Sequence, residues 1–345
     1  MVNLTILAGG YTTFVATYTF NTDTNALTLA GKSTTGANPS WIALNPTNRS
    51  ILYAVNENTQ GGLQSFAISS HATLSPLSTI QSGGGDPAFA TPISTGAVAV
   101  MNYNSGNGKI VPTTSGGAIL GSGNLITFPA KVSHPHMALQ HNNEVFVPDL
   151  GADKIWRLVQ SGNNWNIQGL IQQPTGSGPR HIAIQGNYLF TLHELSSTIT
   201  SQAIPAAPNG TSPFISNLSI LPPNPPAGSV FAAAEILYPT TDYLYPGKYI
   251  YVSNRNTGVQ DPRGDAIAIF LATSTGSLNL VGHVYTGLNQ IRGMQLFGPN
   301  LSYLIAGGYG GGGVAVFERE NNGANLTLLA RNAVLPTATS FVWVY

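Results

Sequence analysis

Residues 178–184 (GPRHIAI) decide the fold, because their pattern returns at residues 38–44 (NPSWIAL) and 134–139 (HPHMAL). In each copy a Pro precedes an apolar-Ala-apolar strand. A second apolar run follows each copy after a polar turn: residues 51–57 (ILYAVNE), 144–149 (EVFVPD) and 188–194 (YLFTLHE). A third run, such as residues 154–158 (KIWRL), comes after a tight turn. Repeats of roughly 40 to 50 residues with three or four strands each are typical of a β-propeller.

The repeat can be followed along nearly the whole chain. We expect six blades at residues 38–68, 86–111, 134–159, 179–204, 233–270 and 291–317. The last run, residues 340–345 (SFVWVY), has no later partner, so it is expected to pair with residues 4–8 and 14–20 as a seventh blade. Such closure removes exposed sheet edges. The sequence therefore predicts an all-β, seven-bladed propeller whose last blade is closed by the N- and C-terminal strands.

A blade repeat from end to end indicates one domain, residues 1–345. The 39 Gly and 23 Pro supply turns, and 42% hydrophobic residues in short alternating runs supply a core. A Pro-rich stretch, residues 205–226, separates blades four and five and is predicted to be a surface excursion over one face.

Composition excludes several classes of partner. Charged residues make up 8% of the chain and cancel to a formal net charge of zero, so neither nucleic acid nor an anionic membrane is expected as a partner. The absence of Cys excludes disulfides, thiolate metal sites and cysteine nucleophiles. No apolar run approaches the roughly 18 residues that a membrane-spanning helix needs. The sequence leaves the oligomeric state open.

Glycosylation sequons are frequent for a chain of this length. With the low charge they favour a secreted or secretory-pathway glycoprotein, although residues 1–5 read as a strand and not as a signal peptide. A cytoplasmic location is the alternative, because sequons arise easily in a chain rich in Asn, Ser and Thr. The sequons begin at Asn3, Asn48, Asn209, Asn217, Asn300 and Asn325.

Side chains capable of chemistry gather at two repeat-equivalent places, the starts of blades and the ends of second strands. A propeller brings these places together at the mouth of its central channel. Arg would hold a carboxylate or lactone there, and His or Glu would move a proton. The candidates are His134, His136, Arg180, His181, His193, Glu194, Asn254, Arg255, Arg292, Glu57 and Asp149.

Structural roles compete with this interpretation. Arg180 and Arg255 would also serve as struts between blades, and Glu194 as the carboxylate of a structural ion pair. Asp149 is expected to organise the turn before the next strand. The Gly-rich residues 307–313 lie between two strands with no following helix, so they are predicted to form a hairpin and not a phosphate-binding loop.

No cofactor or metal is expected. His134 and His136 lie two apart on one strand and share a face, but no third ligand stands nearby in the sequence. The alternative is calcium at the channel mouth, held by oxygen ligands from Glu57, Asn102, Asp149 or Asn254. A Gly-x-Ser-x-Gly nucleophile elbow is also missing.

Six motifs together resemble the seven-bladed lactonase family, which includes propeller 6-phosphogluconolactonases and the fungal 3-carboxy-cis,cis-muconate lactonizing enzyme (carboxymuconate cyclase). The resemblance covers essentially the whole chain. The motifs are residues 38–40 (NPS), 53–57 (YAVNE), 148–154 (PDLGADK), 178–181 (GPRH), 194–198 (ELSST) and 251–255 (YVSNR).

The resemblance to the fungal cyclase implies a catalytic set of His136, Arg180, Glu194 and Arg255, which act without a metal. His134, His181, His193, Arg292, Glu57 and Asn254 are then candidate substrate-binding residues. The sequence departs from the family pattern in two blades. Residues 86–90 (DPAFA) lack a polar residue after the Pro, and Ile291 stands where a Pro is usual.

These observations predict an enzyme, an isomerase or lyase that forms a lactone or a hydrolase that opens one, acting on a small molecule in the central channel. Two alternatives stay open. One is a cyclase or lyase recruited to fungal-type secondary metabolism on the same scaffold, for a dehydration, cyclisation or cycloaddition such as a hetero-Diels–Alder reaction. The other is a non-catalytic secreted binding propeller.

Overall fold

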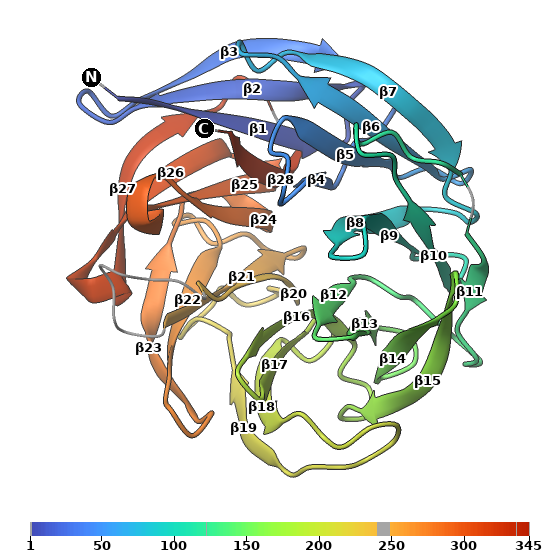
Figure 1. The fold of residues 1–345 in the computed structure, drawn as a ribbon. Coiled ribbons are helices and arrows are strands. Elements are labelled where there is room, and N and C mark those ends of the chain that lie inside the picture. Colours follow the sequence, from blue (N-terminus) through green and yellow to red (C-terminus); the bar gives the residue numbers. More distant parts are fainter. Residues whose placement is uncertain (1, 122, 240–248, 336, 345) are drawn as a thin grey trace.

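Seven four-stranded antiparallel sheets stand around a common centre in the computed structural model, which describes residues 2–121, 123–239, 249–335 and 337–344 (Figure 1). The sheets are the blades of a propeller, and the predicted fold class is confirmed. In each blade the first strand lies nearest the centre and the fourth lies at the rim (Figure 1). No helix among these residues is long and apolar enough to cross a membrane.

The predicted blades one to four each gain a fourth, outer strand. Blade one contains β4 (Ile42–Leu44), β5 (Ile51–Asn56), β6 (Gly62–Ile68) and β7 (Leu74–Gln81). Blade two contains β8 (Pro87–Ile93), β9 (Ala97–Asn102), β10 (Asn107–Pro112) and β11 (Leu125–Thr127). Blade three contains β12 (Leu139–His141), β13 (Glu144–Asp149), β14 (Lys154–Ser161) and β15 (Asn164–Gln172). Blade four contains β16 (Pro179–Gln185), β17 (Tyr188–His193), β18 (Thr198–Ala203) and β19 (Phe214–Ser219).

The remaining blades include two short 3-10 turns, Pro299–Leu301 and Asn321–Gly323. Blade five contains β20 (Phe231–Leu237), β21 (Tyr249–Asn256), β22 (Ala266–Ala272) and β23 (Leu278–Tyr285). Blade six contains β24 (Asn289–Phe297), β25 (Tyr303–Gly311), β26 (Gly313–Glu320) and β27 (Asn325–Asn332). The β25–β26 pair is the hairpin predicted for the Gly-rich residues. Blade seven contains β28 (Ala338–Val344), β1 (Asn3–Gly10), β2 (Phe14–Asn21) and β3 (Ala26–Thr34).

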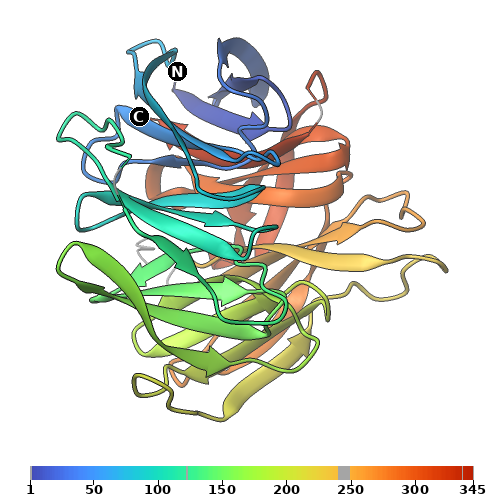
Figure 2. The same ribbon diagram turned by 90° about the vertical axis from the view of Figure 1, so that its right-hand side faces the viewer.

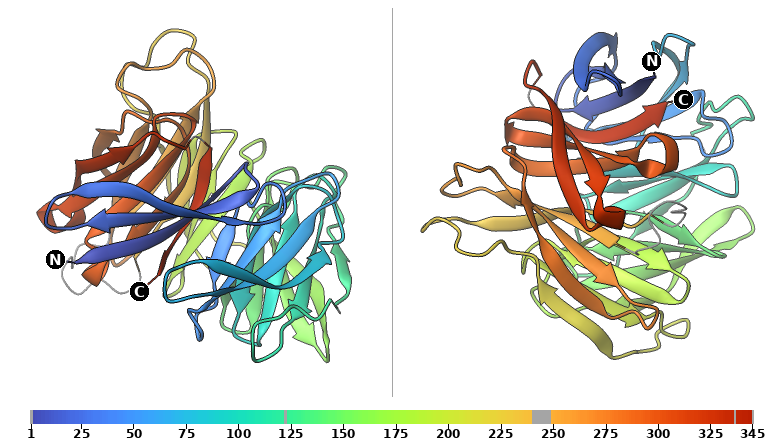
Figure 3. Two further views of the ribbon diagram at one scale, coloured as in Figure 1. Left: turned by 90° about the horizontal axis from the view of Figure 1, so that it is seen from above. Right: turned by 90° about the vertical axis from the view of Figure 1, so that its left-hand side faces the viewer.

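Blade seven is closed by both ends of the chain, as predicted. The inner strand β28 pairs antiparallel with β1, where Ile6 faces Trp343 and Leu7 faces Val342. Strand β1 then pairs with β2, so the N-terminal segment supplies three strands and the C-terminal segment supplies one. Figure 3 shows the two termini on the same blade.

The hydrophobic core lies between neighbouring blades. Phe190 of blade four packs with Val252 and Phe270 of blade five in one such layer, and all three are buried. Close to the axis the backbones themselves approach. A Cβ on Gly293 would lie 2.0 Å from the carbonyl oxygen of Thr339, so only glycine lets β24 and β28 pass this closely.

The Pro-rich stretch is not one excursion, and this part of the prediction is wrong. Strand β19 lies inside residues 205–226 and completes blade four by pairing with β18. The stretch is therefore divided into a loop at residues 204–213 and a second loop at residues 220–230. The second loop bonds to residues 257–259, and in Figure 2 the gold and orange loops of blade five project beyond the disc on one side.

Antiparallel pairing fixes where the functional side chains meet. The start of each inner strand pairs with the end of the second strand, so both positions of every blade lie on one face of the propeller. By register, one residue near the end of each second strand takes an equivalent place on that face. In five blades it is the residue just after the strand, and in blades five and six it lies within β21 and β25. These residues are Tyr11, Glu57, Tyr103, Leu150, Glu194, Arg255 and Tyr309.

Candidate active site

Bulges at the starts of the inner strands aim side chains into the channel mouth. The register of β16 slips between Pro179 and His181, and that of β24 slips between Ile291 and Gly293. The extra residue in each case is an arginine, Arg180 or Arg292. A bulge turns the extra side chain away from the ordinary alternation of the strand, and bulges recur next to active sites for this reason.

Arg180 lies at the centre of the cluster. Its Nη1 donates to Nε2 of His136 at 2.6 Å and to Oε2 of Glu194 at 3.1 Å. Its Nε donates to the carbonyl oxygen of Ala234 at 2.9 Å. The side chain therefore joins blades three, four and five, and it is 2% exposed. Arg180 is both a strut between blades and a member of the cluster.

Glu194 is shared by two arginines. Arg255 places its Nη2 2.8 Å from the same carboxylate oxygen that accepts from Arg180. Burial by itself would raise the pKa of Glu194, but Arg180 and Arg255 outweigh it and hold that pKa below its ordinary value. Glu194 is therefore a carboxylate at neutral pH. The Nε of Arg255 is buried and has no partner within the described ranges.

A second group lies on the blade-six, blade-seven and blade-one side of the mouth. Both oxygens of Glu57 accept from Nη2 of Arg292, at 3.2 and 3.3 Å. Tyr11 donates its hydroxyl to Glu57 at 2.6 Å, and Ser40 donates to the other oxygen. The Arg292 guanidinium lies over the Tyr11 ring, 4.9 Å from its centre. Burial raises the pKa of Tyr11, so its phenol stays protonated.

The two groups form one site. Arg180, Arg255 and Arg292 all act on the pKa of His136, which burial and these cations lower well below its ordinary value. The same three arginines act on Tyr103, whose pKa burial raises. His136 is therefore neutral at physiological pH, in a mouth that holds three guanidinium groups.

Below the mouth lies a layer of packed rings. Trp41 packs against Phe89 with ring centres 4.4 Å apart, and both contact the ring of His181 at 5.4 and 5.6 Å. These residues come second after the Pro in blades one, two and four, so the layer is one residue deeper than Ser40 and Arg180. We call this layer the floor.

Most predicted site residues meet at the mouth. His136, Arg180, Glu194 and Arg255 lie in contact, His181 lies directly below, and Arg292 pairs with Glu57. His134 lies at the edge of the mouth. Its ring stacks on that of Tyr103, with ring centres 4.4 Å apart, and its Nδ1 lies 2.9 Å from the Tyr103 carbonyl oxygen.

His193 and Asn254 do not reach the mouth. Each is the residue directly before a channel position, Glu194 or Arg255, and side chains of a strand alternate in direction. His193 is buried in blade four with its Nε2 2.8 Å from the Thr200 hydroxyl, and burial lowers its pKa to about 4. Asn254 is 1% exposed and donates to the carbonyl oxygen of Ile220.

Asp149 takes the place in blade three that His193 takes in blade four. It organises its turn as predicted, accepting from the Ser133 hydroxyl, the backbone N–H groups of His134 and Ala152, and the Trp156 indole. Asn102 is likewise bonded inside blade two. No cluster of three or more His, Asp or Glu suited to a metal occurs in the described part of the chain.

Sequence reasoning missed Tyr11, Ser40, Tyr103 and Glu235. Tyr11 and Tyr103 follow second strands, as Glu57 and Glu194 do, so counting from strand ends would have found them. Glu235 stands second after the blade-five position equivalent to Pro, but Ala233 replaces that Pro and hides the motif.

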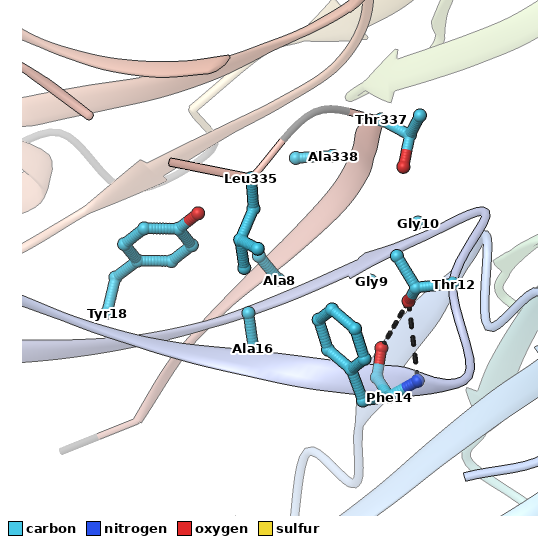
Figure 4. A pocket seen from close by; sticks show the side chains of 10 residues that line it. All are labelled: Ala8, Gly9, Gly10, Thr12, Phe14, Ala16, Tyr18, Leu335, Thr337 and Ala338. Carbon is cyan, nitrogen blue, oxygen red and sulfur yellow. Dashed lines mark hydrogen bonds between the residues drawn. The ribbon is translucent and has the colours of Figure 1, made fainter. Parts of the chain in front are cut away.

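A small cavity that none of the clustered residues lines lies in blade seven. Figure 4 shows it between β1, β2 and the segment that leads into β28, with Phe14, Tyr18 and Leu335 among its lining residues. Its volume is about 10 Å³, which is room for a single water molecule at most. It is too small for a substrate.

Comparison with known proteins agrees with this fold. The sequence profile of the family described as "Lactonase, 7-bladed beta-propeller" matches residues 5–343. The chain belongs to this lactonase family. Membership agrees with the resemblance drawn from the motifs.

Individual relatives are distant but cover nearly the full length. The chain is 25% identical to the 6-phosphogluconolactonase of Bacillus subtilis over 92% of this chain and 91% of that protein. It is 24% identical to a probable 6-phosphogluconolactonase of Arthroderma benhamiae over 93% of this chain and 83% of that protein. The solved structure of a periplasmic gluconolactonase of Pseudomonas aeruginosa superposes with a TM-score of 0.87 at 19% identity, covering 100% of this chain and 99% of that one. This last likeness is one of fold.

Proposed function

We propose that this lactonase-family protein hydrolyses the lactone ring of a small anionic molecule, a sugar acid lactone, at the channel mouth. The observation that carries the proposal is the contact set of Arg180, His136, Glu194 and Arg255 at the channel mouth. Names of relatives support the substrate class, because two of them are called 6-phosphogluconolactonase.

Charge at the mouth favours an anionic substrate. Three guanidinium groups, Arg180, Arg255 and Arg292, face two carboxylates, Glu57 and Glu194. Arg255 has a buried Nε with no partner in the described part of the chain. A carboxylate or phosphate would accept from such donors in a bidentate manner, which is the strongest kind of hydrogen bond available to arginine.

In the proposed hydrolysis His136 transfers the proton, and Glu194 lies nearby. In hydrolysis a water oxygen bonds to the lactone carbonyl carbon and gives up its proton, the ring C–O bond breaks, and the ring oxygen takes a proton. His136 would accept the water proton at Nε2 when Arg180 turns its N–H toward the substrate. A bound anion also offsets the cations that lower the pKa of His136, so the substrate makes His136 a better base.

Ring closure is a second candidate. The four residues in contact are the set that resemblance to the carboxymuconate cyclase implies, and a site that protonates a ring oxygen can also deliver an acid oxygen to an alkene. In that reaction the arginines would hold the carboxylates of the open-chain acid, and a proton would be transferred to carbon as the C–O bond forms. A recruited cyclase acting on a neutral conjugated compound would have little use for three arginines.

Turnover of a matched substrate panel tests the proposal. We would measure acid release above the spontaneous rate for 6-phosphogluconolactone, unphosphorylated gluconolactone and a carboxymuconolactone. We expect the phosphorylated or carboxylated lactones to be preferred. Preference for the neutral lactone would overturn the proposal that the substrate is anionic. An absence of turnover with any lactone would overturn the proposal that the protein is a lactone hydrolase.

We also propose that the chain passes through a secretory pathway, with a cytoplasmic location as the alternative. Support comes from Asn3, Asn48, Asn209, Asn217 and Asn300, the sequon asparagines that lie exposed on the surface. Treatment of the natively produced protein with an N-glycosidase should lower its mass. An unchanged mass would remove this support.

A further inference from the structure

A chain of hydrogen bonds runs from the mouth into the floor. Nη1 of Arg180 lies 2.6 Å from Nε2 of His136. Nδ1 of His136 lies 3.1 Å from Nε2 of His181, and Nδ1 of His181 lies 2.8 Å from Oε1 of Glu235. Its four members come from blades three, four and five. All are buried, with at most 4% of each residue exposed.

The chemistry of arginine assigns every proton in this chain. A guanidinium has only donors, so Nε2 of His136 must accept from Arg180. The neutral ring of His136 then carries its proton on Nδ1, which donates to Nε2 of His181. His181 in turn carries its proton on Nδ1 and donates to the Glu235 carboxylate. No other arrangement of two neutral imidazoles satisfies all three contacts.

A bulge in β20 places Glu235 next to the floor residue His181. The register of β20 slips between Ala233 and Ile236, and this bulge contains Glu235. Its Oε1 accepts from the backbone N–H of Ile236 at 2.9 Å as well as from His181, and its own N–H donates to the Ser253 hydroxyl. Oε2 is buried with no partner within the ranges that the structure describes. Desolvating a carboxylate is costly, so a role beyond packing is indicated.

We propose that His181 and Glu235 are positioning residues that hold His136 in the tautomer protonated on Nδ1, so that its Nε2 lone pair faces Arg180 at the mouth. The expected effect on kcat rests on the proposed function, whereas the tautomer of His136 does not. When Nε2 takes a proton, His136 becomes a cation; its Nδ1–H keeps its acceptor in His181, and the Glu235 charge offsets the new positive charge. In a histidine–carboxylate pair the carboxylate accepts directly from the histidine that moves the proton. Here one further imidazole, that of His181, stands between His136 and Glu235.

The substitution Glu235→Gln tests the kinetic consequence. Glutamine keeps the shape and can still accept from His181, but it loses the charge. We expect kcat on the best lactone to fall by about 10- to 100-fold with KM unchanged, because the charge acts when His136 is protonated and not when substrate binds. The control is Glu144→Gln, which also removes a carboxylate paired with a basic side chain, but whose partner, Arg157, lies in the same blade and away from the mouth. Equal kcat values in the two variants would overturn the proposal.

The tautomer can be read without any substrate. NMR of the wild-type protein with 15N-labelled histidine reports which ring nitrogen carries the proton. We expect both His136 and His181 to be neutral and protonated on Nδ1 at pH 7. A proton on Nε2 of His136, or a cationic His136, would overturn the proposal even if a lactone is turned over. The expected tautomers would support it even if every lactone in the panel is refused, so failure of the proposed function is distinguishable.

Discussion

At the scale of single residues, Arg180 explains why the cluster is both rigid and reactive. It contacts His136, Glu194 and a backbone carbonyl in three blades, and burial together with Arg255 lowers its pKa to about 9. Such a guanidinium has lost its water and lies among competing partners. An incoming anion therefore replaces existing partners at little further desolvation cost, which favours selective binding of an anionic group.

Glu194 gives a pH-dependent stability that can be measured. Its pKa in the folded protein lies below its ordinary value, so its contribution to stability is present above about pH 4.5 and is lost as the pH falls through the folded pKa. We expect wild type to have a higher Tm than Glu194→Gln at pH 7. The difference should shrink steadily below pH 4.5.

The matched control is Glu318→Gln, because Glu318 forms no ion pair in the portion of the chain that the structure describes. Its Tm difference from wild type should not follow this pH course. A difference for Glu194→Gln that is the same at pH 3.5 and pH 7 would contradict the account.

Most residues of the cluster could be predicted from the sequence because their types are rare in this chain and fall at repeat-equivalent places. It placed His193 and Asn254 at the mouth wrongly because a shift of one residue along a strand reverses the direction of the side chain. It missed Glu235 because the partner that explains a buried carboxylate, His181, is 54 residues away. Only the fold shows that contact.

At the scale of strands, the floor is set by the residue that comes second after the Pro in blades one, two and four. Phe89 of β8 is 4% exposed and packs between Trp41 and His181. It therefore links the aromatic layer to the hydrogen-bonded chain below the mouth. Removing its ring would leave His181 without support on one side.

We expect Phe89→Ala to lower the free energy of unfolding by about 3 to 5 kcal/mol, the usual cost of deleting a buried aromatic ring. It should also lower kcat, because His181 is no longer held. Denaturant unfolding and steady-state kinetics check both parts. Leu77→Ala in β7, where the side chain is 41% exposed, serves as the control and should change stability by less than about 0.5 kcal/mol. Equal unfolding free energies for both variants would contradict a packed floor.

Most inner, second and third strands were predictable because they contain continuous apolar runs; β12 (LQH) and β18 (TITSQA) do not. The fourth strands were not, since they lie at the rim and expose alternate side chains. Strand β19 shows the difficulty: residues 214–219 (FISNLS) are half-exposed or exposed throughout and are followed by a Pro-rich loop, so composition favoured an insertion. Pairing with β18 supplies the backbone partners that the side chains do not reveal.

At the scale of the whole molecule, the fold is a closed ring in which the C-terminal strand is also an inner wall of the channel. Strand β28 pairs with β1 and touches both neighbouring blades, since the hydroxyl of Ser340 bonds to Ile42 and Gly293 packs on Thr339. Closure was readable from the sequence because residues 340–345 had no other partner. The angle at which neighbouring blades meet could not be predicted from the sequence.

Deleting residues 338–345 should therefore unfold the protein or lower its Tm far more than a terminal deletion usually does, because β1 loses its inner partner and blades six and one lose a shared wall. Thermal unfolding followed by circular dichroism measures this. The control is wild type with eight Gly and Ser residues added after the last residue, which should keep its Tm. A deletion variant as stable as the control would contradict closure by β28.

The central claim is that Arg180 and its partners form a lactone-processing site for an anionic substrate. The most direct test compares kcat/KM of wild type, Arg180→Ala and Arg263→Ala on the preferred lactone. Arg263 is the matched control because it also pairs with a carboxylate, Asp261, but its side chain is 55% exposed. We predict a loss of about 10²-fold or more for Arg180→Ala, as for removal of a group that stabilises developing charge, and no change for Arg263→Ala. A folded Arg180→Ala variant with wild-type kcat/KM would contradict the account.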